Sequence, residues 1–93
     1  MRKVAILGIG QTKIDEHWEK SLRELGGDAA FAAMQDAGLQ KVDSLFVGNM
    51  LSPLINGQNQ LGTFFADWIG MWKQEAVKIE AACGSGAAAF RSA

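Results

Sequence analysis

Cys83 is the only cysteine of the 93-residue sequence, and its neighbours give it the setting of a reactive thiol. A β-branched apolar segment, 76–82, precedes it, and a run of small residues, 84–89, follows. The first pattern predicts a strand, and the second predicts the start of a closely packed helix. A thiol at a helix N-terminus meets unpaired N–H groups and a partial positive charge, which favour the nucleophilic thiolate. A buried, inert cysteine is the structural alternative.

A nucleophilic cysteine needs a general base or a positive neighbour. His17, between Glu16 and Trp18, is the only histidine, and its polar surroundings favour a solvated loop residue over a catalytic base. No cluster has metal-ligand spacing, and Gly8-Ile9-Gly10 is a poor match to a dinucleotide-binding turn. The 93 residues therefore predict a nucleophile, Cys83, without a complete catalytic set.

Composition places the chain among soluble globular proteins of one domain at most. It is 48% hydrophobic and carries a net charge of −1. No run reaches the roughly 18 apolar residues of a membrane span, and no basic stripe indicates nucleic-acid binding. A lone cysteine and the absence of a signal-peptide pattern predict a cytoplasmic protein.

Strand-like and helix-like segments alternate along the chain. The capping-box pair Ser21 and Glu24 predicts where the first helix begins, and Gly38 predicts where it ends. Residues 49–60, which contain Pro53 and Gly57, are expected to form a long loop. The resulting order, β-α-β-α-β-α, predicts a parallel sheet with right-handed crossovers. The expected strands are 3–10, 42–48 and 76–82, and the expected helices are 21–37, 61–71 and the segment from 84 onward.

Two features indicate that this sheet is incomplete. Lys78 and Glu80 point to the same face of the third expected strand, which suits a sheet edge, a subunit interface or a partly solvated face. The chain also stops inside its last expected helix, without a capping signal. We expect an N-terminal piece of a longer chain, and the alternative is a short protein completed by a partner.

Five segments, taken in order, resemble the N-terminal part of a thiolase of the sterol-carrier-protein-like branch found in archaea and bacteria. The most specific is Glu80-Ala81-Ala82-Cys83-Gly84-Ser85-Gly86-Ala87-Ala88-Ala89, which is similar to the family's nucleophile motif. The others are looser matches: 4–13, 21–25, 47–50 and 57–58. The resemblance implies an α/β fold in which residues 1–93 form the N-terminal β-α-β-α-β-α part of a layered αβαβα domain with a mainly parallel sheet.

The resemblance also implies an activity. Cys83 would carry an acyl group between coenzyme A thioesters, in the Claisen condensation of two acetyl-CoA molecules or in the reverse thiolysis. The Cys83 backbone N–H would be an oxyanion donor. The activating histidine, the enolate-stabilising groups and a second cysteine would lie in later segments, so we expect the 93-residue piece alone to be inactive.

Further expectations follow from the same resemblance. They are acyl-CoA substrates without a resident cofactor, a homodimer or tetramer paired through the third strand, and a place in lipid or isoprenoid metabolism. Hydroxymethylglutaryl-CoA synthase and a small zinc-containing scaffold protein are possible partners. Two other functions stay open: a ketoacyl or hydroxymethylglutaryl-CoA synthase of the same superfamily, and a non-catalytic thiolase-like subunit that binds acyl-CoA or a partner enzyme.

Overall fold

A computed structural model describes residues 2–93 of the chain. The described residues form four helices and two strands, and they divide into two compact units that meet in sequence between Lys41 and Val42. The first unit contains one helix, and the second contains both strands and three helices. The elements are α1 Leu22–Ala37, β1 Ser44–Gly48, α2 Ser52–Ile55, α3 Leu61–Trp68, β2 Glu75–Ile79 and α4 Ser85–Ser92.

Both ends of α1 are capped by the residues that the sequence predicts. The Glu24 backbone N–H donates to Ser21 Oγ at 3.2 Å, and the Ser21 N–H donates to Glu24 Oε2 at 2.7 Å. This reciprocal pair is a complete capping box. Gly38 ends the helix with a φ of 70°, a left-handed conformation that glycine adopts without a Cβ clash. The predicted helix and both of its caps are confirmed.

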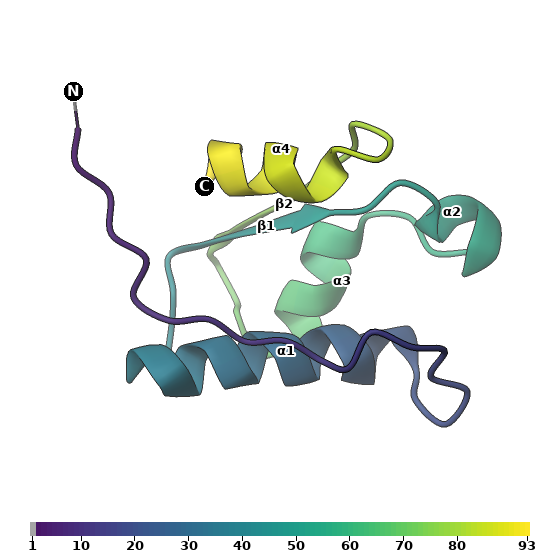
Figure 1. Ribbon diagram of the computed structural model, residues 1–93, viewed down its shortest axis with the longest axis horizontal. Coiled ribbons are helices and arrows are strands. Elements are labelled where there is room, and N and C mark those ends of the chain that lie inside the picture. The colour runs from purple at the N-terminus through teal and green to yellow at the C-terminus, as the bar shows by residue number, and fades with distance from the viewer. Residues whose placement is uncertain (1) are drawn as a thin grey trace. The chain divides into compact units, whose positions relative to one another are not determined.

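The strand predicted over 3–10 is absent from the structure. This segment runs beside α1 as irregular chain (Figure 1), and the Ile9 N–H donates to Asp36 Oδ2 at 2.9 Å. Gly10 lies so close to α1 that a Cβ would come within 2.5 Å of the Ala29 carbonyl oxygen. An apolar run becomes a strand only when a neighbouring strand completes its ladder, and within residues 2–93 this segment contacts a helix instead.

The second unit is built on a parallel pair of strands. Ser44 of β1 pairs with Glu75 of β2, and the register continues to Gly48 and Ile79. Helices α3 and α4 pack against the two strands, and Figure 1 shows them on opposite sides of the pair. The α/β class and the parallel pairing are confirmed, although both strands are shorter than predicted.

The connection between β1 and α3 is not the plain loop that the sequence predicted. It contains α2, a single helical turn with Pro53 in its first positions. A backbone N–H has no partner within the helix there, so the N–H that proline lacks is not missed. The Ser52 N–H donates to Asn49 Oδ1 at 2.8 Å and fixes the entry to this turn. Helix α3 ends at Trp68 rather than near 71, because Gly70 adopts a φ of 80° and reverses the chain.

Few side chains of the described residues are fully buried. The buried apolar ones are Leu61, Ala66, Met71 and Ala89, which come from α3, the turn that follows it and α4. Trp72, beyond the end of α3, is 72% exposed. Among the described residues, no helix is both long and apolar enough to cross a membrane.

Candidate active site

Cys83 lies in the turn that connects β2 to α4. The residue is exposed, and its thiol is free. Gly84 is the N-cap of α4, so the cysteine directly precedes the helix. This is the strand-to-helix position that the sequence predicted. The alternative of a buried cysteine is wrong for this structure, because Cys83 is exposed.

Residues 80–85, called here the cysteine turn, hold an unusual backbone conformation just before the thiol. Ala82 has a φ of 48°, in the left-handed region that residues with a Cβ adopt rarely. The Ala82 N–H donates to the Glu80 carboxylate, and the Gly84 N–H donates to the Ala81 carbonyl at 2.9 Å. Side-chain and backbone hydrogen bonds therefore stabilise a conformation that alanine alone would not favour.

Ser85 adds two more hydrogen bonds to the cysteine turn. Its Oγ accepts from the Ala81 N–H at 2.9 Å and donates to the Ala82 carbonyl at 2.7 Å. The residue is only 4% exposed, so its hydroxyl is shielded from water. Sequence reasoning missed this role. The available signal was a serine at a helix start, where hydroxyls often bond to nearby backbone groups.

Gly48, the last residue of β1, allows the first turn of α4 to approach the sheet. A Cβ at Gly48 would lie 2.6 Å from the Ser85 carbonyl carbon and 2.8 Å from Gly86 Cα. Carbon atoms in ordinary contact are about 3.5–4.0 Å apart, so only glycine fits. The sequence predicted that a strand ends at Gly48, but not that α4 packs directly against this residue.

His17 belongs to the first unit, where its ring makes local contacts. Nε2 lies 2.7 Å from the Lys13 carbonyl oxygen, and Nδ1 lies 3.4 Å from Glu19 Oε1. The hydrogen bond to the Lys13 carbonyl raises the pKa of His17 above its usual 6.5; Glu19 acts in the same direction and desolvation opposes it. His17 lies in a loop, as the sequence predicted, but its side chain is only 14% exposed and so is less solvated than expected.

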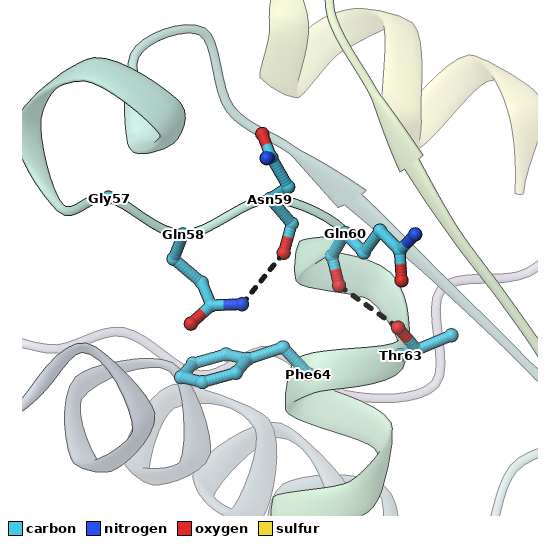
Figure 2. A pocket seen from close by; sticks show the side chains of 6 residues that line it. All are labelled: Gly57, Gln58, Asn59, Gln60, Thr63 and Phe64. Atoms are coloured by element: carbon cyan, nitrogen blue, oxygen red, sulfur yellow. Dashed lines mark hydrogen bonds between the residues drawn. The ribbon is translucent and has the colours of Figure 1, made fainter.

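An open hollow of about 390 Å³ lies at the start of α3 (Figure 2). Gln58, Asn59 and Gln60 line its loop side with carboxamide groups, and Phe64 contributes an aromatic ring. Gln58 Nε2 donates to the Asn59 carbonyl at 2.9 Å, and Thr63 Oγ1 donates to the Gln60 carbonyl at 3.1 Å. Among residues 2–93, no group of three or more His, Cys, Asp or Glu side chains is placed to hold a metal ion.

Comparison with known proteins assigns the family. Residues 4–93 match the family described as "Thiolase, N-terminal domain", which is nearly the whole chain. The chain belongs to the thiolase family. Cys83 and its turn fall inside the matched region of this thiolase domain, and the α/β fold with its parallel strands agrees with the assignment.

Curated relatives support the same family. An acetyl-CoA acetyltransferase of Methanocaldococcus jannaschii is 41% identical over 95 residues, covering 100% of this chain and 24% of the relative. An acetyl-CoA acetyltransferase of Methanothermobacter thermautotrophicus is 38% identical over 94 residues, covering 99% of this chain and 24% of the relative. The benzoylsuccinyl-CoA thiolase subunit BbsB of Thauera aromatica is 32% identical over 96 residues, covering 99% and 23%. The thiolase domain described here thus spans about a quarter of the length of these relatives.

Proposed function

We propose that this thiolase domain supplies the nucleophile for acyl transfer between coenzyme A thioesters, with Cys83 as the acyl carrier. The observation that carries the proposal is the exposed thiol in the turn from β2 into α4, within a chain of the thiolase family. Two relatives named acetyl-CoA acetyltransferase support an acetyl group as the acyl unit.

The first half-reaction forms a thioester on the protein. The Cys83 thiolate attacks the carbonyl carbon of acetyl-CoA, the bond from that carbon to the coenzyme A sulfur breaks, and coenzyme A leaves as a thiolate that takes up a proton. Cys83 directly precedes Gly84, the N-cap of α4, where the positive end of the helix dipole favours negative charge. The Cys83 backbone N–H is a donor for the oxygen of the tetrahedral intermediate.

The second half-reaction returns the thiol. A base removes an α-proton from a second acetyl-CoA, and the resulting carbanion attacks the acetyl-Cys83 carbonyl carbon. A carbon–carbon bond forms, the carbon–sulfur bond to Cys83 breaks, and acetoacetyl-CoA is released. The reverse sequence is thiolysis of a 3-ketoacyl-CoA. We assign the base and the enolate-stabilising groups to segments beyond these 93 residues, and we propose that this piece alone is inactive.

The remaining parts of the proposal rest on the family resemblance. They are a homodimer or tetramer paired through β2, and association with hydroxymethylglutaryl-CoA synthase and a zinc-containing scaffold protein. A cytoplasmic location is proposed separately, from the lone cysteine. The half-buried Lys78 of β2 suits a strand that meets a partner, whereas Glu80 lies in the turn beyond the end of the strand. The family match favours a thiolase over the two synthases of the same superfamily.

A non-catalytic thiolase-like subunit that binds acyl-CoA or a partner enzyme is the second candidate; one relative is named as a subunit of a thiolase, a name that does not say whether that subunit is catalytic. The experiment that separates the two functions follows exchange of labelled coenzyme A into acetyl-CoA by the intact protein, which requires only the first half-reaction. We expect Cys83→Ala to abolish exchange while its sedimentation profile stays that of the wild type. The control is Ser92→Ala, at the far end of α4. Exchange that survives in Cys83→Ala would refute the acyl-carrier role and favour the subunit function.

A further inference from the structure

We infer that Ser85 is a positioning residue for Cys83: its buried hydroxyl holds the cysteine turn in the conformation that presents the thiol to a bound thioester. This inference rests on the proposed function of Cys83 as acyl carrier. It assigns to Ser85 an effect on acyl transfer that acts through the backbone, without contact between the serine and the substrate.

The conformation that needs support lies one residue before the thiol. Ala82 has a φ of 48°, where its Cβ crowds the following carbonyl oxygen. Because Cys83 follows directly, rotation of Ala82 out of this region would swing the Cys83 side chain to a new direction. The direction of the thiol therefore depends on whatever keeps Ala82 left-handed.

Ser85 supplies that support from two sides of Ala82. Its Oγ accepts from the Ala81 N–H and donates to the Ala82 carbonyl, so one hydroxyl spans the backbone on both sides of the left-handed residue. The Ser85 N–H also donates to the Ala82 carbonyl at 3.2 Å. At 4% exposure, the hydroxyl has no water to replace these partners, and its removal leaves the Ala81 N–H without its partner.

The direction of these bonds distinguishes Ser85 from a serine that only caps a helix. A capping serine occupies the N-cap and accepts from N–H groups further along the helix. Ser85 is the first helical residue. The N-cap is Gly84, which has no side chain that could cap the helix. Its hydroxyl reaches back toward the end of the strand segment, and what it stabilises is the cysteine turn.

Glu80 is a second support, from the other side of the same residue. Its carboxylate accepts the Ala82 N–H. Unlike Ser85, Glu80 is exposed, so its substitution does not disturb packing. Glu80 accepts a hydrogen bond from the Ala82 N–H, and Ser85 donates one to the Ala82 carbonyl. The same hypothesis can therefore be tested by substituting either a buried or an exposed residue.

The test uses the intact protein and compares acetyl transfer with alkylation of Cys83 by iodoacetamide, which needs no aligned substrate. We expect Ser85→Ala to lower kcat for labelled coenzyme A exchange roughly tenfold, with KM within about twofold and alkylation within about threefold of wild type. Ser85→Thr, which keeps the hydroxyl, restores exchange. The matched control Ser92→Ala removes another α4 hydroxyl, one that donates to the Ala88 carbonyl at 2.9 Å, and leaves exchange unchanged.

Glu80→Ala keeps the inference testable if Ser85→Ala fails to fold. It lowers kcat for exchange about threefold, and Glu80→Gln, which keeps an acceptor oxygen, restores it. Normal exchange in folded Ser85→Ala, or in Glu80→Ala where Ser85→Ala does not fold, would overturn the positioning role while the function of Cys83 stands. A loss in which exchange and alkylation fall together would also overturn it, because the thiol itself would be impaired. Full-length wild-type protein without exchange, as distinct from the 93-residue piece that we propose is inactive, would overturn the proposed function, and this inference with it.

Discussion

The contact between the end of β1 and the first turn of α4 predicts a large effect from a single methyl group. Gly48→Ala places a Cβ 2.6 Å from the Ser85 carbonyl carbon and 2.8 Å from Gly86 Cα. Relief of these contacts requires a movement of about 1 Å, because carbon atoms in contact prefer about 3.5–4.0 Å. The obstructing atoms belong to backbone, which cannot rotate away as a side chain does. We expect a loss of about 3 kcal/mol, at the upper end of the usual cost of overpacking.

Gly86→Ala is the matched control, since it adds the same methyl group in the first turn of α4 but in open space. A Cβ at Gly86 would meet no atom within 4 Å, and its helical backbone accommodates alanine. Alanine is favoured over glycine inside a helix, so we expect this variant to gain about 0.5 kcal/mol. The two substitutions, identical in chemistry, should therefore change stability in opposite directions.

The assay is urea unfolding of the intact protein followed by circular dichroism, with amide hydrogen exchange in α4 as a local measure. The geometry predicts a lower midpoint and faster exchange in α4 for Gly48→Ala, and neither change for Gly86→Ala. If Gly48→Ala stayed within about 0.5 kcal/mol of wild type, the close approach of α4 to β1 would be incorrect.

Three further predictions concern local structure. Ser21→Ala removes the Oγ that accepts from the Glu24 N–H at the start of α1, and should cost about 1 kcal/mol in urea unfolding; an unchanged midpoint would contradict this side-chain cap. His17 should titrate above 6.5 by NMR, because its bond to the Lys13 carbonyl raises its pKa. That contribution is complete below the unfolded value, near 6.5, and disappears as pH rises through the folded pKa, so a midpoint at or below 6.5 would refute it. Lys73→Gly should gain about 0.5 kcal/mol in thermal unfolding, because Lys73 has a φ of 72°; a loss would show that its side chain matters more than its backbone.

The sequence predicted those elements whose signals are local. The capping box at Ser21 and the left-handed Gly38 need only neighbouring residues, so both ends of α1 were predictable. The strand predicted over 3–10 was not, because a strand exists only with a partner and the sequence pattern does not reveal which element lies alongside. The same limit explains why β1 and β2 are shorter than their apolar patterns.

The candidate site was also predictable from the sequence only in part. The position of Cys83 between a strand and a helix followed from the change of pattern around it. The groups that support Cys83 did not follow from the sequence. Gly48 is 35 positions from Cys83, and Ser85 acts through a turn whose left-handed residue, Ala82, is not a glycine and so gives no sequence signal. The resemblance to thiolases indicated Cys83 as the candidate nucleophile, and the structure shows which groups hold its turn.

Cys83 as an acyl carrier is the central claim, and mass spectrometry tests it most directly. The intact protein is incubated with acetyl-CoA, quenched in acid, weighed whole and mapped by peptide. The account predicts one acetyl increment on the peptide that contains Cys83, removed by added coenzyme A and absent in Cys83→Ala. A protein whose Cys83 reacts with iodoacetamide but takes no acetyl group from acetyl-CoA would contradict it.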